Sequence, residues 1–198
     1  MRKFAIFFGG AALLAACQTN PPPPPAPPPV AVDPNNPLFA PGFLAQAGSS
    51  GQFEIQSSQL ALQMSQNAAV RNFANYMIAD HTRLAQAVGA AAASAGITPP
   101  PPGLLPGDQA ALDQLRASGS GPSFDLAYKN AQISAHQSAL QLMQNYNANG
   151  DVPALRAAAG QAIPTIQMHL QQAQMLNVAP PAPPPPPAPV PGRAGERG

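Results

Sequence analysis

Proline is concentrated in two tracts near the ends of the chain, and this distribution restricts what the chain can fold into. Most of its 28 prolines lie at residues 21–29 and 180–191. Proline lacks a backbone N–H and fixes φ, so such tracts form extended polyproline II instead of helix or internal strand. The segment between them, residues 38–178, has the length of one ordinary domain. We therefore expect one folded domain followed by a disordered proline-rich tail, residues 179–198.

The first 17 residues have the pattern of an export signal. Arg2 and Lys3 precede an apolar run over residues 4–16, which is shorter than the about 20 residues of a transmembrane helix. The run ends in the letters LAAC, which is similar to a bacterial lipobox, in which the cysteine is lipidated. We predict a signal peptide over residues 1–16 and lipidation of Cys17, with an ordinary signal peptide as the alternative.

The residues that follow Cys17 predict how the domain is held at a membrane. Acyl chains on Cys17 would anchor it, since each buried CH₂ contributes about 0.8 kcal/mol. Residues 17–37 would form a stiff linker that reaches about 60 Å. Gln18 favours the outer membrane under the sorting rule of enteric bacteria. We predict an outer-membrane lipoprotein of the bacterial envelope that faces the periplasm. Its expected partners are the membrane, through the lipid anchor, and peptidoglycan or an envelope protein.

Within residues 38–178, apolar side chains recur in steps of three and four, as in helices that pack on one face. The pattern predicts four long helices and one short extra helix, over residues 41–66, 68–95, 109–117, 124–148 and 152–177. The predicted N-caps are polar residues that can accept a hydrogen bond from the first turn: Asn67, Asp108, Ser123 and Asp151. We therefore predict an all-α fold, an up-down antiparallel four-helix bundle with the short helix between helices two and three.

Charged side chains are unusually scarce. Asp, Glu, Lys and Arg make up 9% of the residues, against about a quarter in typical soluble proteins, and the formal net charge is +1. The basic residues form no patch in the sequence, which argues against a nucleic acid partner. Aromatic residues make up 6% of the chain and tryptophan is missing from it, so we expect a core of small side chains on closely packed helices.

Three groups of residues resemble one known family. They are FA at 73–74 with DHT at 80–82, FD at 124–125 with Tyr128 and His136, and IP at 163–164 with HL at 169–170. Together they resemble the bacterial "predicted outer membrane protein" family, a domain of unknown function numbered DUF4142, over residues 43–176. The resemblance implies a ferritin-like bundle of four long helices that is often exported. It implies no established activity.

All three histidines of the chain fall on the apolar stripes of predicted helices. His81, His136 and His169 lie on the second, third and fourth long helix, and Glu54 lies on the first. Counted from the turn between their helices, Glu54 and His81 lie at nearly the same level, and His136 and His169 are offset by about 7 Å. Side chains lean toward the N-terminus of their helix, which reduces this offset. One layer of the bundle can therefore hold all four groups.

Three imidazoles and one carboxylate are a ligand set for one transition metal, such as Zn, Cu, Fe or Ni. The hypothesis is a metal site made of His81, His136, His169 and Glu54. Asp80, Asp125 and Tyr128 are the candidates to orient the imidazoles from behind. The alternative is that the histidines are buried hydrogen-bonding groups that fix the helix register. The domain would then be a metal-free structural or interaction module of the cell envelope.

The pattern of a ferritin-like di-iron centre is missing from the sequence. Such centres use Glu-x-x-His on two helices, whereas Met77 stands three residues before Asp80, and Ile166 three before His169. This argues against a di-iron oxidase or an iron store. The residues also contain no Ser-His-Asp, Cys-His or phosphate-loop arrangement, so we predict no catalytic residues and expect a protein that is not an enzyme.

Overall fold

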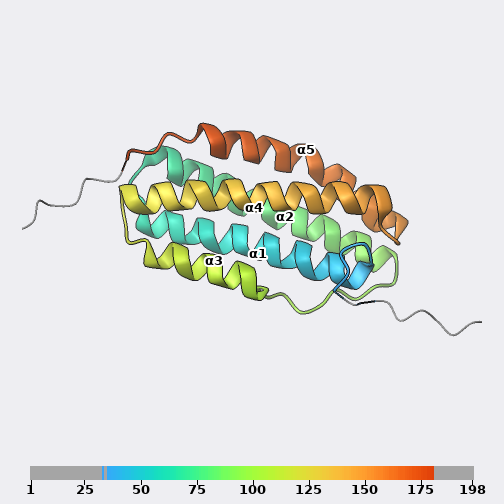
Figure 1. Ribbon diagram of the computed structural model, residues 1–198. Helices are drawn as coiled ribbons and strands as arrows, with labels where there is room; N and C mark the ends of the chain where they lie inside the picture. Colours follow the sequence, from blue (N-terminus) through green and yellow to red (C-terminus); the bar gives the residue numbers. More distant parts are fainter. Residues whose placement is uncertain (1–32, 34, 181–198) are drawn as a thin grey trace, which may run out of the picture. The chain divides into compact units, whose positions relative to one another are not determined.

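The structure is a computed structural model that describes residues 33 and 35–180 (Figure 1). The predictions for the signal peptide, for Cys17 and for the two proline tracts concern residues outside this part, apart from the first residue of the second tract. None of the helices in the described part is both long enough and apolar enough to cross a membrane.

Five helices and no strand are present in residues 35–180. The helices are α1 (Ala40–Met64), α2 (Ala68–Ser94), α3 (Pro106–Ala117), α4 (Pro122–Asn149) and α5 (Pro153–Met175). The all-α class is confirmed, and α3 is the short extra helix that was predicted between the second and third long helices.

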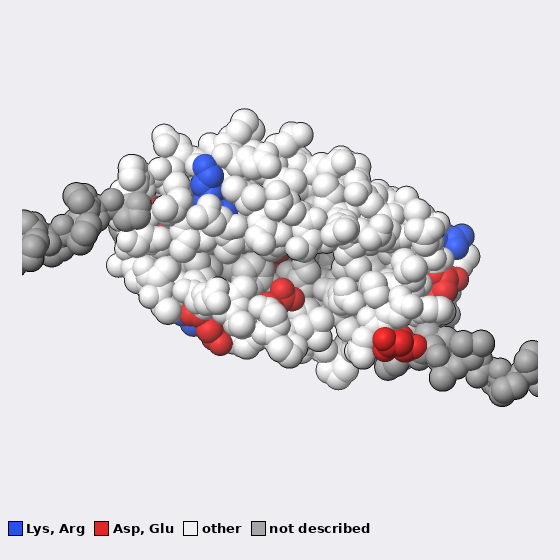
Figure 2. All heavy atoms as spheres, viewed as in Figure 1, with Lys and Arg blue, Asp and Glu red and all other residues white. Residues whose placement is uncertain are grey.

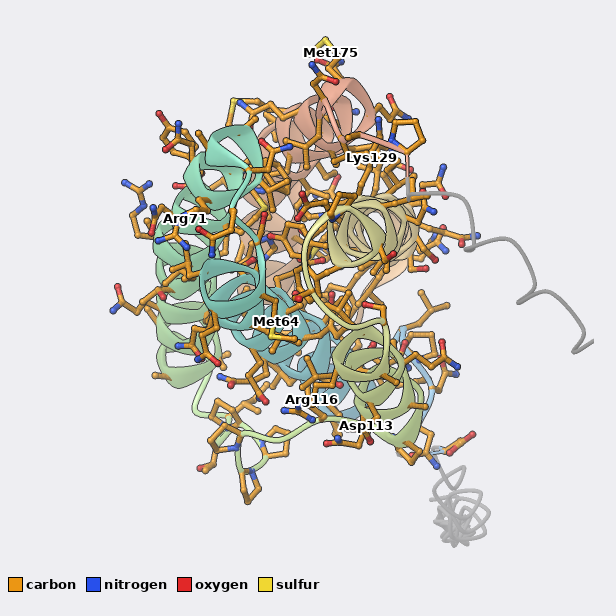
Figure 3. All side chains as sticks on the ribbon, turned by 90° about the vertical axis from the view of Figure 1, so that its left-hand side faces the viewer. Met64, Arg71, Asp113, Arg116, Lys129 and Met175 are labelled. Atoms are coloured by element: carbon orange, nitrogen blue, oxygen red, sulfur yellow. The ribbon has the colours of Figure 1, made fainter. Side chains whose placement is uncertain are left out.

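The four long helices form a bundle in which each helix packs on two antiparallel neighbours. Helix α1 contacts α2 and α4, and α5 contacts the same two helices from the other side. Two backbone hydrogen bonds join the ends of α1 and α4, from Gly121 to Met64 and from Asp151 to Leu38. Helix α3 lies outside the bundle against α1 and α4 (Figure 3). It returns the chain along the bundle, so that α2 and α4 run in the same direction across the diagonal (Figure 1).

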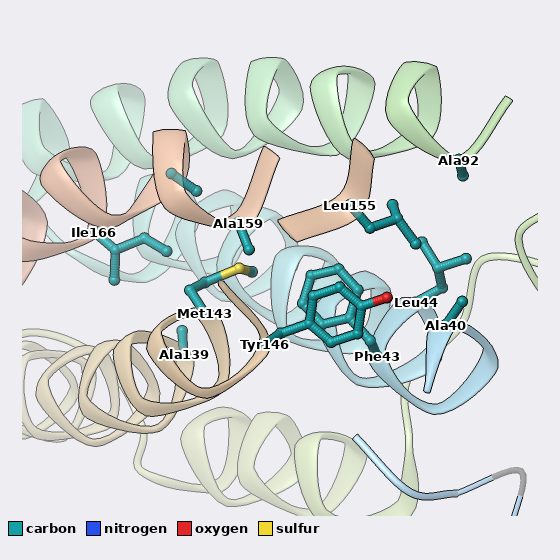
Figure 4. Close-up of a cluster of buried hydrophobic side chains, with 11 residues drawn as sticks. Ala40, Phe43, Leu44, Ala92, Ala139, Met143, Tyr146, Leu155, Ala159 and Ile166 are labelled. Carbon is teal, nitrogen blue, oxygen red and sulfur yellow. The ribbon is translucent and has the colours of Figure 1, made fainter. Parts of the chain in front are cut away.

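Two apolar clusters fill the ends of the bundle and leave a polar layer between them. One cluster contains Phe43 and Tyr146, whose rings stack with centroids 3.8 Å apart (Figure 4). The other contains Phe73 and Tyr128, whose rings meet edge to face at 6.1 Å. Alanines occupy many of the remaining core positions. The face seen in Figure 2 carries few charged side chains, as the composition predicts.

Of the predicted N-caps, Asn67 is confirmed, because its side chain accepts a hydrogen bond from the Ala69 N–H. Three predicted caps are wrong: Asp108, Ser123 and Asp151. The corresponding helices begin instead on a proline, at Pro106, Pro122 and Pro153. Proline suits the first helical position because its φ is already helical and its missing N–H would have no partner there.

Two of the rejected caps have other partners. The Asp108 carboxylate accepts a hydrogen bond from the buried Ser49 hydroxyl, which ties α3 to α1. The Asp151 carboxylate accepts one from the Tyr146 hydroxyl at 2.8 Å. Both carboxylates therefore stabilise contacts between chain segments, which cannot be predicted from local cap patterns.

Candidate metal centre

His81, His136 and His169 meet in the polar layer between the two apolar clusters. Their ring centroids lie 5.5 Å apart for His81–His136 and 5.4 Å apart for the other two pairs. His136 and His169 are fully buried, and 5% of the surface of His81 is exposed. One nitrogen from each ring can be chosen so that all three nitrogens lie within 4.8 Å of one another. Three helices therefore direct three imidazoles toward one point.

The backbone and a carboxylate fix which nitrogens remain free on two of the rings. His136 donates its Nδ1–H to the Gln132 carbonyl at 2.7 Å, because a carbonyl can only accept. His169 uses Nε2 to contact a carboxylate oxygen of Asp80 at 2.8 Å. In the neutral rings the lone pair then lies on Nε2 of His136 and on Nδ1 of His169. Both of these nitrogens are buried without a hydrogen-bond partner.

Buried polar atoms without a partner are concentrated at this point. Seven such side-chain atoms occur in the described residues, and five of them belong to Glu54, His81, His136 and His169. Each unpaired buried group costs about 1–3 kcal/mol, so native proteins keep few of them. The free nitrogens of His136 and His169 each offer a lone pair, so these two cannot satisfy one another. Lone pairs of this kind are what a metal ion accepts.

Electrostatics keeps the three imidazoles neutral. Burial, together with the other two rings, lowers the pKa of His81 to about 3. Burial also lowers the pKa of His136 to about 4, although the Gln132 carbonyl opposes the change. The pKa of His169 is lowered by burial, with Asp80 acting in the opposite direction. Neutral imidazole is the form that binds transition metals.

Asp80 is hydrogen-bonded to His169 and forms an ion pair with Arg83. Burial alone would raise the pKa of Asp80, but the bonds to His169 and to the Arg83 guanidinium outweigh burial and lower it. Asp80 is thus an ionised acceptor behind the ring, on the side away from the free Nδ1. A carboxylate in this place fixes the orientation of a metal-binding imidazole and raises its basicity.

Glu54 lies beside His136 but not at the point where the free nitrogens converge. Its Oε1 is 3.4 Å from Nδ1 of His136, the nitrogen that already donates to the backbone. Glu54 is also not part of the group whose candidate ligand atoms lie within 4.8 Å of one another. Burial raises the pKa of Glu54 to about 8, with the Gln132 side chain opposing the shift. The structure thus places Glu54 behind an imidazole, as it does Asp80.

Two predicted supporting residues do not contact the histidines. Tyr128 shares a hydrogen bond of 2.8 Å with Ser58. Asp125 is buried near the start of α4, and one of its carboxylate oxygens has no partner. Along α4 these residues precede His136 by eight and eleven positions, about 12 and 16 Å at 1.5 Å per residue. The prediction that they orient imidazoles is therefore wrong.

Gln132, which was not among the predicted site residues, contributes twice to the polar layer. Its carbonyl accepts from His136, and its side-chain amide donates to the Ser57 hydroxyl at 3.0 Å. The signal was present, because Gln132 precedes His136 by four residues and therefore lies on the same buried face of the helix. Ser57 in turn lies one turn after Glu54, so a polar seam runs between α1 and α4.

The spacing of the nitrogens is close to that of a metal centre. Three nitrogens at bonds of about 2.0–2.1 Å around a tetrahedral ion lie about 3.3 Å from one another. The three candidate nitrogens are at most 4.8 Å apart. Inward movements of each ring by less than about 1 Å would close the difference. The residues present therefore fit one transition-metal ion.

The fold and the site define a class: an antiparallel helical bundle with three buried histidines in its core. The chain belongs to the family described as Domain of unknown function (DUF4142), whose model matches residues 25–176. A solved structure described as "CopM in the Cu(II)-bound form" is similar, with a TM-score of 0.58 and 20% identity over 69% of this chain and 94% of that chain. At this identity the likeness concerns the fold alone. No curated protein matches the chain significantly.

Proposed function

We propose that the bundle binds one transition-metal ion through His81, His136 and His169. The observation that carries the proposal is the meeting of three buried imidazoles: one nitrogen from each ring can be chosen within 4.8 Å of the others. Each ring also has a buried nitrogen without a hydrogen-bond partner. A single ion would satisfy all three. In a metal-free hydrogen-bonded core, at least the free nitrogens of His136 and His169 would each need a donor, and no described side chain supplies one.

Copper is the ion that we name first, with zinc and iron as the alternatives. Imidazole suits all three metals. The similar CopM was solved in a Cu(II)-bound form, which supports copper for this fold. Asp80 places an ionised carboxylate behind the His169 ring, where it would offset the charge of a divalent ion, and Glu54 lies behind the His136 ring. A di-iron centre would need bridging carboxylates, and the group of converging ligands contains histidines alone.

We also propose that the metal is bound at the cell envelope. Support comes from the lipobox-like LAAC sequence that ends at Cys17 and from the proline-rich linker that follows it. The domain would then face the periplasm on a spacer, within reach of peptidoglycan or an envelope protein. Radiolabelled palmitate incorporation that is lost in Cys17→Ser would support the anchor, and equal labelling of both chains would contradict it.

Metal retention tests the binding proposal. The purified full chain is loaded separately with Cu(II), Zn(II) and Fe(II), desalted and analysed for metal. We expect about one ion per chain for at least one metal, and less than about a tenth of that for the triple variant His81→Ala, His136→Ala, His169→Ala. Gln137→Ala is the control, because Gln137 is exposed and adjacent to His136 in the sequence, and this variant should retain the metal. Equal retention by the triple variant, or none by the wild type, would refute the proposal.

A further inference from the structure

A cavity of about 460 Å³ lies between α1 and α2 and reaches the histidine layer. The segment Pro99–Leu105, which contains four consecutive prolines, forms its outer wall. Met143 from α4 and Ile166 from α5 form its inner wall, and His81 is part of its lining. The volume is within the usual range for small-molecule sites, about 300–1,000 Å³.

The cavity adjoins the candidate metal centre on one side. Its lining includes Leu84, which follows His81 by three residues, Ala139, which follows His136 by three, and Ile166, which precedes His169 by three. On each of these helices the lining residue is therefore one turn from a histidine, toward the end of the bundle that holds Phe43 and Tyr146. The cavity thus reaches His81 directly and ends one helical turn from the other two histidines.

The chemistry of the lining restricts what the cavity can hold. No Asp, Glu, Lys or Arg is among the lining residues, and His81 is the only titratable one. His81 is 95% buried, since 5% of its surface is exposed, and its Nε2 has no hydrogen-bond partner. Most of the other lining residues are apolar. A charged ligand would lose its hydration here without a counter-charge, whereas an uncharged, mainly apolar ligand would be favoured.

Glycines keep the wall of the cavity open. Gly51 in α1 and Gly89 in α2 line it, and a Cβ added to either residue would meet no atom within 4 Å. A glycine inside a helix costs about 1 kcal/mol relative to alanine. Gly51 and Gly89 therefore lower helix stability at positions where the surrounding atoms would leave room for a larger side chain. Open space in the wall of the cavity is therefore built into the helices themselves.

We propose that this cavity is the ligand chamber of the metal centre. A small uncharged organic molecule with an apolar body and one coordinating nitrogen enters beneath Pro99–Leu105 and takes the coordination position that the three histidines leave open. Three protein ligands with one free position are the arrangement that accepts an exogenous ligand. This inference rests on the proposed function, because the nitrogen of the ligand binds the ion.

The test uses the metal-loaded full chain and the probe 4-phenylimidazole, which joins an apolar ring to an azole nitrogen. Binding is followed by the ligand-field spectrum of Cu(II), or of Co(II) in place of Zn(II). We expect a saturable 1:1 change for the wild type, with affinity at least about tenfold above that of imidazole, because the phenyl ring fills the chamber. In Gly51→Leu and in Gly89→Leu the affinity for 4-phenylimidazole should fall at least about tenfold while one ion remains bound.

Gly107→Leu is the matched control. Gly107 also has open space around its Cβ position, but it lines a different groove, between α1, α3 and α4. This variant should bind 4-phenylimidazole as the wild type does. The inference is overturned if the metal-loaded wild type gives no saturable change, or if both chamber variants bind the probe as tightly as Gly107→Leu. A wild type that retains no metal would refute the proposed function as well, and metal analysis before the titration separates the two failures.

Discussion

His169 and Asp80 are joined across the α2–α5 interface by a hydrogen bond of 2.8 Å between Nε2 and a carboxylate oxygen. The bond leaves Nδ1 of His169 as the free nitrogen, which is buried without a hydrogen-bond partner, and the ring lies 5.4 Å from each of the other two rings between centroids. Since Asp80 also binds the exposed Arg83, the carboxylate stays ionised and keeps its place at the edge of the bundle. The ring of His169 is therefore held in one tautomer and one orientation before any ligand arrives.

Replacing Asp80 should weaken metal binding without removing a metal ligand. In Asp80→Asn the amide can still occupy the same space, but it no longer accepts strongly from Nε2–H, so both the tautomer and the basicity of His169 are less well fixed. Changes of this kind typically cost 10–100-fold in metal affinity. We expect a loss of about that size, measured by competition with a chelator of known affinity.

Arg83→Gln is the control for the Asp80 variant. The Arg83 side chain is 73% exposed, and exposed ion pairs contribute about 0–1 kcal/mol, so this change should alter metal affinity by less than about fivefold. An Asp80→Asn protein that binds metal as tightly as Arg83→Gln would show that Asp80 does not support the site.

The buried titratable groups predict an unusual pH profile for the metal-free protein. The pKa of Glu54 is raised to about 8, so between its unfolded value near 4.5 and pH 8 the folded state binds the proton more tightly, and stability falls as pH rises. The histidine pKa values are lowered, so stability falls as pH drops below 6.5. Denaturant unfolding should therefore give a maximum near pH 6.5, where the two trends balance.

Glu54→Gln isolates the alkaline side of this profile. Glutamine has nearly the same shape and does not ionise, so the decline in unfolding free energy between about pH 6.5 and 8 should disappear, while the decline below pH 6.5 should remain. The slope that is lost is at most about 1.4 kcal/mol per pH unit for one group. A variant that keeps the full alkaline decline would show that another group causes it.

The helices and the position of the site along the bundle axis could be predicted from the sequence. The direction in which each side chain points from its helix could not. Counting residues from the turns placed Glu54, His81, His136 and His169 in one layer, because the rise per residue is nearly constant. Whether Glu54 meets the free nitrogen of His136 or its opposite side depends on how closely α1 and α4 approach. Ser57 and Ser58, two small residues buried on α1, are hydrogen-bonded to Gln132 and Tyr128 of α4 at this interface.

The errors in the sequence-based prediction have two different causes. Asp125 and Tyr128 were assigned to the imidazoles although the same rise per residue places them two and three turns away along α4, so the sequence itself contained the correction. The rejected caps arose because a second local rule was passed over, the preference of proline for the first helical position, which Pro106, Pro122 and Pro153 occupy. The contact that Asp108 makes instead, with Ser49 across 59 residues of chain, cannot be predicted from any local pattern.

Removing one histidine should separate stability from metal binding. In the metal-free protein His81 contributes a buried nitrogen without a partner, and replacing such a group by an apolar side chain of similar size is neutral or stabilising. We expect the free energy of unfolding of metal-free His81→Leu to equal that of the metal-free wild type or to exceed it by up to about 2 kcal/mol, as measured by denaturant unfolding. Its melting temperature should no longer rise when metal is added, whereas that of the wild type should rise. A clear loss of metal-free stability would indicate that His81 has a hydrogen-bonded structural role.

Two glycines in α1 should respond in opposite ways to the same substitution. A Cβ at Gly42 would overlap the backbone carbonyl of Asn36, which is fixed by its own hydrogen bond from Phe39. A Cβ at Gly48 would meet no atom within 4 Å. Gly42→Ala should therefore destabilise the protein by about 1–3 kcal/mol through steric overlap. Gly48→Ala should stabilise it by up to about 1 kcal/mol through helix propensity. Denaturant unfolding of the two variants side by side measures the difference, and a gain in stability for Gly42→Ala would contradict the close approach of residues 35–36 to the start of α1.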